Sequence, residues 1–583
     1  MHLAQLNISN FRKLQKAKLE FQPGLNILVG ANNVGKTAVV DALRALLAGH
    51  EEPYPRLDSD DAHRPKGGKP AGDIVFQYIF RGLTEDDEAD FLAALKPDAT
   101  GKLEAHITIR YIEADMTGRL RAKRWCGDNE DLGLTADMME NLRGVYLPPL
   151  RDASQSLRPS RTSQLSRLFQ LLADEAGRDG INAALKTLDV ELNNLQPMVT
   201  TNAAIKTRHD SMLGPHLVQA LEIGLAASDF HRVASRLSLL VDAFEIEQNG
   251  LGFNNLIFMA VVLCELAKNP EAAYRGLIVE EPEAHLHPQL QAVLLSYLES
   301  IKDVQGERPV QLFLTSHSPN FASLADLDSL TCLVDTGATV ETFFPRTIKF
   351  EAGKREKLER YLDATRAELF FARRVIFVEG AAELMLVSVL AEKSGFNLRE
   401  HGVSLISVEG LNFDSFLPLF GEQALKVPVA LITDADPVGE PTVEGDEPLA
   451  LYPTIGDTVK VSDNTAKMKG KEDSFVKVFH GLKTLEYDLA LHSENRTAML
   501  KALRELHPRI ADALETAVDA AADDAAKAQI LFTGMFERKT NNVKKGSFGQ
   551  SLAQVLSDGA EFKLPEYIRK AIMHVCQAGP AKV

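Results

Sequence analysis

The sequence predicts an α/β protein with two units built on parallel strands and a helical segment inserted in the first. Three observations support this fold class. The buried strand Leu25–Val29 runs into a glycine-rich loop and an amphipathic helix. Much later, the apolar runs Val375–Val378 and Val427–Thr433 each end on carboxylates and are separated by helical pattern. Between these regions, residues 154–213 have helical periodicity and almost no strand pattern.

Composition limits the possible classes of protein. The chain has 583 residues, enough for about two to four domains, with 45% hydrophobic and 25% charged residues, as in a globular protein. Its formal net charge of −17 argues against a protein that coats nucleic acid over its whole surface. Four cysteines without CxxC spacing indicate neither a zinc site nor a disulfide framework. With no basic start and no stretch expected to reach the length of a membrane span, we expect a cytoplasmic protein without membrane contact.

The loop after the first buried strand has the GxxxxGK[ST] pattern. It reads Gly30-Ala-Asn-Asn-Val-Gly35-Lys36-Thr37 and lies between a strand and a helix, the context that this motif requires. The glycines let backbone N–H groups surround phosphates, Lys36 reaches the β- and γ-phosphates, and Thr37 can bind Mg²⁺. The predicted ATP contacts here are Gly30, Asn33, Gly35, Lys36 and Thr37.

The strands around this unit differ in pattern. The runs at 74–80 and 105–112 are expected in a partly antiparallel sheet, and further strands are expected at 217–225 and 235–247. The helical segment has two apolar stripes, which indicate either a dimer interface or a subdomain packed on its own sheet. The sequence leaves both alternatives open.

Three later features can complete a nucleotide site. A glycine-rich turn, Gln248–Asn255, precedes an apolar helix and can offer N–H groups to an anion. The buried run Leu277–Val279 ends on Glu280 and Glu281, and His317 follows another strand. We expect Glu280 to hold Mg²⁺ through water, Glu281 to orient or deprotonate the attacking water, and His317 to sense the γ-phosphate. Each residue alone is more often structural, but their order at strand ends favours function.

The second pool of carboxylates comes from Glu379, Glu383, Asp434 and Asp436. Two parallel strands that each deliver acids at their carboxyl ends bring these oxygens to one edge of a sheet. Mg²⁺ prefers a few carboxylates together with water and a phosphate, so the grouping suits phosphodiester chemistry. The alternative is that strand ends are acidic by chance.

These motifs together resemble a known family. Residues 1–345, including Ile8-Ser-Asn-Phe-Arg12, resemble the ABC-type ATPase heads of the RecF, Rad50 and SMC group. The run Glu280-Glu-Pro-Glu-Ala-His-Leu-His-Pro288 resembles the OLD (overcoming lysogenisation defect) nucleases, which include the Gabija A component and retron-associated nucleases. That family joins such a head to a TOPRIM domain. The resemblance implies an ATPase domain at 1–345 with a helical dimerisation insert at about 154–215, followed by a TOPRIM nuclease domain with helical elements at 346–583.

The resemblance also implies roles for individual residues. Glu379, Glu383, Asp434 and Asp436 match the family's metal-binding acids, with Glu379, Asp434 and Asp436 catalytic. Glu486 in Lys483-Thr-Leu-Glu486 matches a further ligand, with Asp488 as the alternative, and Lys545 matches a lysine that stabilises the scissile phosphate. The implied cofactors are Mg²⁺ or Mn²⁺ at these acids and ATP with Mg²⁺ at the loop around Lys36. Two departures are a turn at 248–255 without Ser-Gly-Gly and Glu280 in place of the usual aspartate.

The predicted function is therefore a metal-dependent DNA endonuclease or nickase, regulated by ATP binding or hydrolysis and assembled as a homodimer. The family implies a role in bacterial antiphage defence, with a helicase-like or retron partner. One alternative is an ATP-operated DNA clamp or recombination mediator whose acids are structural. Another is topoisomerase-like strand passage, for which Tyr487 is the candidate nucleophile nearest the acids.

Overall fold

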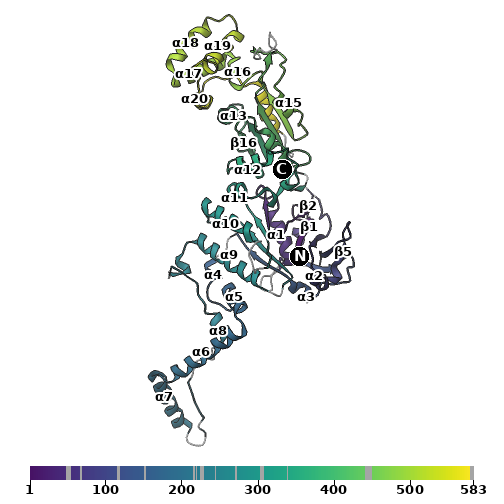
Figure 1. Cartoon of the computed structure of the whole chain (residues 1–583), viewed down its shortest axis with the longest axis vertical. Coiled ribbons are helices and arrows are strands. Elements are labelled where there is room, and N and C mark those ends of the chain that lie inside the picture. Colours follow the sequence, from purple (N-terminus) through teal and green to yellow (C-terminus); the bar gives the residue numbers. More distant parts are fainter. Residues whose placement is uncertain are drawn as a thin grey trace.

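A computed structural model describes residues 1–577 except 48–53, 66–67, 114–117, 150–152, 214–216, 218, 224–228, 243, 270–271, 302–307, 338 and 440–448. Figure 1 shows an elongated molecule with a helical arm at one end, followed by the N-terminal sheets and then the later α/β layer. The helices α17 (Ser493–Leu506), α18 (Pro508–Asp519) and α19 (Asp524–Phe536) form the other end. The expected fold class, a head with a helical insert followed by a second α/β layer, is confirmed.

The first sheet is antiparallel and covers one side of the head. Its register places Ile8 opposite Phe76 and Phe76 opposite Ile109, so apolar residues gather on one face. This confirms the antiparallel strands expected from the alternating runs. The strands in spatial order are β2 (Leu14–Glu20), β1 (His2–Phe11), β4 (Ile74–Arg81), β6 (Leu103–Glu113) and β5 (Leu95–Pro97), with β7 (Leu120–Cys126) paired to β6.

The second sheet carries the glycine-rich loop, and all its pairings except the β13–β14 edge are parallel. Helix α1 (Lys36–Leu47) lies between the two sheets and buries its apolar residues against both. Parallel strands end at one edge, so the loops after them meet there. The order is β14 (Val340–Phe343), β13 (Leu330–Asp335), β3 (Leu25–Val29), β12 (Gln311–Thr315), β11 (Tyr274–Glu280) and β8 (Leu142–Leu147).

The third sheet is parallel throughout. Its register pairs Phe377 with both Ile406 and Leu431, and all three side chains are buried. Helix α13 (Ala381–Lys393) packs against α20 (Lys545–Ser557), and α21 (Glu566–Gln577) packs against three of the strands. The order is β16 (Val403–Ser407), β15 (Arg374–Val378), β17 (Val429–Thr433) and β20 (Val476–His480).

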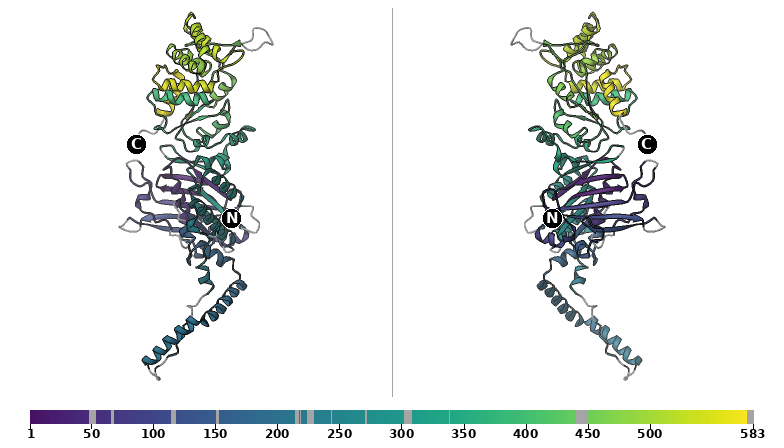
Figure 2. Two further views of the ribbon diagram at one scale, coloured as in Figure 1. Left: turned by 90° about the vertical axis from the view of Figure 1, so that its left-hand side faces the viewer. Right: turned by 90° about the vertical axis from the view of Figure 1, so that its right-hand side faces the viewer.

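Only part of the helical insert packs on the head. Helix α5 (Gln164–Leu172) lies against α9 (Leu251–Lys268) and α8 (Phe230–Ala234). In contrast, α6 (Glu175–Asn193) and α7 (Gln196–Leu213) contain no buried residue and project away from the body, as Figure 2 shows. The alternative of a subdomain packed on the body therefore describes α5 only, and its contacts are with helices.

Two expectations from sequence need correction. Within the described part of 235–247, the strand pattern yields only the short hairpin β9 (Leu240–Val241) and β10 (Phe244–Glu245), and the described residues of 217–225, which are 217 and 219–223, form no strand. Helix α9 is long and apolar enough to cross a membrane, contrary to the expectation that no stretch reaches that length. It packs against α5, α4 (Ala153–Ser156) and β11, with 56% of it buried, as expected of a core helix.

Candidate functional site

Two groups of predicted residues lie at the carboxyl edges of the two parallel sheets. At the first edge, the glycine-rich loop follows β3, His317 follows the adjacent strand β12, and Glu280 and Glu281 end the next strand, β11. The strand order thus brings together segments that are some 240 to 290 residues apart in the chain.

The backbone of the glycine-rich loop explains its glycines. Gly30 has φ +147°, and a Cβ there would lie 2.5 Å from the carbonyl oxygen of Leu333. Gly35 has φ +109°, and Asn33 occupies the left-handed region with φ 63°. Larger side chains at the two glycines would strain the curled loop, whose backbone N–H groups are what a phosphate needs.

Lys36 folds back on its own loop. Its Nζ donates to the carbonyl oxygens of Gly30, at 2.6 Å, and Ala31, at 3.1 Å. Burial lowers the pKa of Lys36 to about 8, although the nearby carboxylates of Glu281 and Glu283 oppose this shift. An incoming phosphate would supply the negative charge that this buried ammonium lacks.

Thr37 and Glu280 lie together, as Mg²⁺ with ATP would require. The Thr37 hydroxyl donates to Glu280 Oε2 over 3.4 Å, and the hydroxyl of Tyr146 on β8 donates to Oε1 over 2.7 Å. Burial raises the pKa of Glu280, which favours a nearby cation. Sequence reasoning missed Tyr146, because its proximity depends on β8 pairing with β11.

The acids after β11 face His317. Glu281 has φ 48°, and its Oε1 lies 3.9 Å from Nε2 of His317. Glu283, which the sequence reasoning did not single out, accepts hydrogen bonds on Oε1 from Ser316 Oγ, at 2.7 Å, and from His317 N, at 3.1 Å. Burial raises the pKa of Glu283 and lowers that of His317. The acid three residues after Glu280 was the available sequence signal.

The second edge brings Glu379 and Asp434 into direct contact. They follow the adjacent strands β15 and β17, and Glu379 Oε1 accepts from Asp434 N at 2.8 Å and from Thr433 Oγ1 at 2.6 Å. Burial raises the pKa of both carboxyl groups. Two acids that hold their protons more tightly than usual indicate a shortage of positive charge.

Glu383 and Asp436 complete the predicted acids at this edge. Glu383 lies buried in the first turn of α13, and Asp436 follows β17 with φ 38°. The N–H groups of Ala435 and Asp436 donate to the carbonyl oxygen of Lys483, at 2.8 and 3.3 Å, which fixes this loop. Burial raises the pKa of both Glu383 and Asp436.

Glu486 and Lys545 converge on the same acids from distant segments. Glu486 lies in α16 (Leu485–Ala490) and is 1% exposed, and its Oε2 is 2.9 Å from Nζ of Lys545 at the start of α20. Burial alone would lower the pKa of Lys545, but Glu486 and Asp434 more than offset this and raise it. Oε1 of Glu486 is buried and has no hydrogen-bond partner among the described residues.

Asp488, the alternative to Glu486, already has a structural role. Its carboxylate accepts from the N–H groups of Leu482, at 3.0 Å, and Lys483, at 3.3 Å. A Cβ at Gly481 would lie 1.6 Å from Asp488 Oδ2, so the turn is closed around this carboxylate. The geometry therefore favours Glu486 over Asp488 as the residue free to bind a ligand.

The donor set fits a divalent cation. It consists of carboxylates with raised pKa values and one buried orphan oxygen, and the Lys545 ammonium lies among them as a positive charge. As they stand, the described residues contain no group of three or more His, Cys, Asp or Glu side chains that could hold one ion. The ion pair with Lys545 occupies Oε2 of Glu486, whereas Oε1 has no partner among the described residues.

Two tyrosines near the acids differ in their surroundings. Tyr487 is fully buried and its hydroxyl donates to Pro453 O at 3.0 Å, which does not suit a nucleophile. Tyr567, on α21, is half-buried, and burial together with Asp488 and Asp434 holds its pKa well above the usual value. Sequence reasoning did not single out Tyr567.

Comparison with protein families agrees with this architecture. A family described as "AAA ATPase domain" matches residues 1–123 and 145–322, slightly more than half of the chain. A family described as "Overcoming lysogenization defect protein-like, TOPRIM domain" matches residues 370–436, which include Glu379 and Asp434. The fold and these domains define an ATP-linked nuclease. The chain belongs to the AAA ATPase domain family, and its TOPRIM domain is OLD-like, which confirms the predicted resemblance to the OLD nucleases.

Two named relatives and one solved structure are similar to this chain. An "OLD nuclease" of Thermus scotoductus is 25% identical over 414 residues, covering 65% of this chain and 71% of the relative. An "Endonuclease GajA" of Bacillus cereus strain HuB5-5 is 21% identical over 535 residues, covering 75% of this chain and 77% of the relative. A solved C-terminal region of the Burkholderia pseudomallei OLD protein is 24% identical, with a TM-score of 0.26 over 36% of this chain and 98% of that one.

Proposed function

We propose that the protein is a divalent-metal-dependent DNA endonuclease or nickase whose activity is governed by ATP at the head. The observation that carries this proposal is the convergence of Glu379, Glu383, Asp434 and Glu486 around Lys545. A folding role alone does not need several buried acids with raised pKa values and one shared ammonium. The names of the OLD and GajA relatives support the same activity.

The acids divide the work at the phosphodiester. Glu379, Glu383, Asp434, Asp436 and Glu486 would hold Mg²⁺ or Mn²⁺, which activates water and offsets charge on the leaving oxygen when bound. Thr433 Oγ1 and Asp434 N hold Glu379 in place through Oε1, which leaves its other oxygen for a ligand. Lys545, released from Glu486, would donate to the scissile phosphate.

ATP would act as a regulator at the first edge. Lys36 would exchange the carbonyl oxygens of Gly30 and Ala31 for the β- and γ-phosphates, while Thr37 and Glu280 hold its Mg²⁺. Glu281 and His317, whose Oε1 and Nε2 atoms lie 3.9 Å apart, would face the attacking water and the γ-phosphate. Of the segment Gln248–Asn255, which was expected to be a turn, residues 251–255 instead begin helix α9 with Gly250 as its N-cap, and a Cβ at Gly252 would lie 2.6 Å from His285 O in the loop after Glu283. The N-terminus of α9 would provide the second nucleotide contact.

A homodimer would form through the projecting arm. Large apolar side chains of α6 and α7 are exposed, including Val190 (62%), Val199 (48%) and Met212 (77%). Two copies could cover these stripes against each other. Replacing Val190 and Val199 by Asp should convert dimers to monomers in light scattering, whereas the same change at exposed Leu451 in the TOPRIM region should not. An unchanged mass for the arm variant would rule out the arm as the interface.

The biological role that fits is cytoplasmic defence of a bacterium against phage, with a helicase-like or retron-encoded partner. The resemblance to the GajA endonucleases supports this role. Cells that express the chain with its neighbouring genes should resist phage infection, and Asp434→Asn should remove the protection. Equal plaque counts with and without the genes would contradict the proposed role.

The chemistry is tested with supercoiled plasmid and Mg²⁺ or Mn²⁺. The parent should nick the plasmid, and Glu379→Ala and Asp434→Ala should not; exposed Glu400→Ala is the control. ATP-dependent retention of DNA without strand breaks, in any divalent metal, would favour a DNA clamp instead. Equal nicking by the parent and both alanine variants would show that the acids are assigned wrongly.

A further inference from the structure

A connection through the protein begins at the nucleotide edge with Glu283. This carboxylate receives Ser316 Oγ and the His317 N–H on Oε1, and its Oε2 has no hydrogen-bond partner among the described residues. It also lies close enough to Lys36 to interact electrostatically. When Lys36 turns to a phosphate, the electrostatic environment of Glu283 changes. This change can alter the hydrogen bonds by which Glu283 holds Ser316 and His317.

The loop leads without a break into helix α11 (Pro319–Leu324). Ser316 Oγ accepts from Ser318 N at 3.1 Å, and Ser318 Oγ caps the helix by accepting from Phe321 N at 3.2 Å. The Ser316 hydroxyl thus connects Glu283 with Ser318, and the Ser318 hydroxyl connects the loop with the first turn of α11. A shift of the Ser316–Ser318 loop would carry the start of α11 with it.

Helix α11 packs against the turn that enters the TOPRIM layer. This turn is the 3₁₀ segment η7 (Arg366–Phe370), and Leu369 and Phe370 share one buried cluster with Phe321 of α11. The same cluster continues to Phe377 on β15, so the two parts are joined by packed side chains. Close-packed interiors transmit displacement.

Arg366 extends the connection to the acids. The buried guanidinium donates to Ser407 O at 2.9 Å and pairs with the carboxylate of Glu409, at the turn after β16. From this turn, Gly410 N donates to Glu379 O at 2.8 Å and Ser407 Oγ donates to the same oxygen at 3.4 Å. The position of Glu379 therefore depends on a turn that Arg366 holds.

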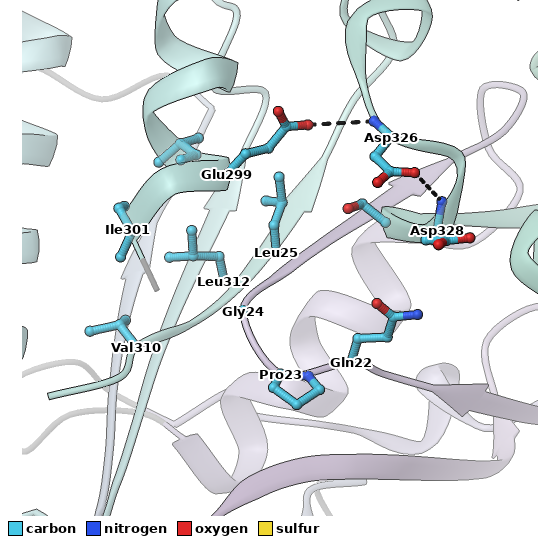
Figure 3. Close-up of a pocket in the computed structure, with 12 residues that line it drawn as sticks. Gln22, Pro23, Gly24, Leu25, Glu299, Ile301, Val310, Leu312, Asp326 and Asp328 are labelled. Atoms are coloured by element: carbon cyan, nitrogen blue, oxygen red, sulfur yellow. Dashed lines mark hydrogen bonds between the residues drawn. The ribbon is translucent and has the colours of Figure 1, made fainter. Parts of the chain in front are cut away.

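Space beside α11 allows it to move. A surface cavity of about 510 Å³ borders Ser323 and Leu324 on α11 and Arg355 and Leu362 from the following helical segment. A second cavity, of about 300 Å³, shares the lining residues Glu299 and Asp326 with the first, and Figure 3 shows the residues around this second cavity. The helix is thus firmly packed toward η7 but bordered by open space elsewhere, as a shifting element requires.

We propose that Glu283 and Arg366 are positioning residues at the two ends of one mechanical connection, by which occupancy of the nucleotide site moves Glu379 at the nuclease site. The proposal rests on the proposed function and names how that function is regulated. It requires no contact between ATP and the DNA-cleaving acids. The route is Glu283, the Ser316–Ser318 loop, α11, η7 with Arg366, and the turn at 407–410.

The test compares nicking rates with and without ATP at concentrations that saturate each protein, verified by calorimetry. The parent ratio should depart from one by about fivefold or more, a usual size for coupling between sites. Glu283→Gln, Arg366→Gln and the milder Arg366→Lys should bring the ratio to within about twofold of one. Matched controls are the buried Glu265→Gln and Arg496→Gln; Arg496 donates to Ala490 O, away from the route. A parent ratio of one, or variants that keep the parent ratio, would overturn the proposal.

Hydrogen–deuterium exchange separates this proposal from the nuclease assignment. ATP should change exchange of the amides at 407–412 in the parent and in the two controls, and should leave them unchanged in the Glu283 and Arg366 variants. This result would support the connection even in a protein that does not nick DNA, whereas absence of nicking would count only against the proposed function. An ATP-independent exchange rate at 407–412 in the parent would contradict the connection.

Discussion

The two candidate sites share a topology and differ in charge. Both lie where loops follow parallel strands, but the first is a glycine-built cradle around one lysine, Lys36, and the second is a carboxylate cluster around one lysine, Lys545. Burial dominates at Lys36 and lowers its pKa, whereas at Lys545 the surrounding acids dominate and raise it. The comparison teaches that the sheet edge only gathers residues, and that the local charge balance decides whether the edge awaits an anion or a cation.

The largest expected effect concerns the carboxylate cluster, the site that awaits a cation. Asp434→Asn keeps the shape of the side chain but removes the charge, and should reduce metal-dependent nicking by about 100-fold or more, because the ligand contributes to charge stabilisation in the transition state. Rates on supercoiled plasmid at saturating Mg²⁺ give the measurement. The control is Asp463→Asn, an exposed acid on α15 (Asp463–Lys469), which should match the parent. Equal loss in both variants would mean that overall acidity matters and not the site.

The corresponding change in the glycine-rich loop, the site that awaits an anion, is Lys36→Ala. Removal of the only lysine in the loop should weaken ATP binding by about 100-fold, the usual consequence of losing a charged hydrogen-bond donor to phosphate. Calorimetric titration with ATP measures this directly, and exposed Lys393→Ala serves as control. ATP should also no longer change the nicking rate of the Lys36 variant. Unaltered ATP affinity in Lys36→Ala would contradict the assignment of the glycine-rich loop as the phosphate site.

A rise in pH should change the ligand affinities of the two sites in opposite directions. Lys36 is charged below its pKa of about 8, so ATP affinity should fall as pH rises through 8, by up to about tenfold per unit. The raised pKa values of Glu379, Glu383 and Asp434 mean that these acids lose their protons later than usual, so metal affinity should rise with pH. Titrations of ATP and Mn²⁺ between pH 6 and 9 give both slopes. Slopes of the same sign would contradict the charge assignment. Lys36→Arg, which stays charged throughout, should flatten only the ATP slope.

The smallest expected effect concerns a residue beside the acids that we place outside the chemistry. Tyr487→Phe removes a buried hydrogen bond to Pro453 O and should cost about 1 kcal/mol of unfolding free energy while nicking stays within about twofold of the parent. Denaturant unfolding and the plasmid assay give the two numbers. A covalent protein–DNA adduct in the parent that disappears in this variant would instead revive strand passage.

Sequence reasoning identified site residues directly after predicted strands. It was less successful for site residues that come from other segments and reach the site only in the folded chain. Glu379 and Asp434 were predicted to meet because both end parallel runs, and the adjacency of β15 and β17 makes the contact direct. Glu486 and Lys545 came only from the family resemblance, since no local pattern places two segments about sixty residues apart on one acid cluster.

The residues that the sequence missed depend on strand order and on helix direction. Tyr146 reaches Glu280 only because β8 pairs with β11, and Tyr567 comes close to the acids because α21 begins at the carboxyl edge of the third sheet. Neither arrangement is written in the spacing of one segment. The apolar length of α9 was underestimated for a related reason: its polar residues, such as Asn254 and Glu265, interrupt the pattern but are buried in the fold.

The central claim is that the carboxylates at the third sheet bind a divalent cation. Anomalous diffraction from crystals soaked in Mn²⁺ tests it most directly. We predict a peak bounded by Glu379, Asp434 and Glu486, with Lys545 displaced from its position 2.9 Å from Glu486, and loss of this peak in Asp434→Asn. A map with no peak at these acids, while the glycine-rich loop binds Mn²⁺ with ATP in the same crystal, would contradict the claim.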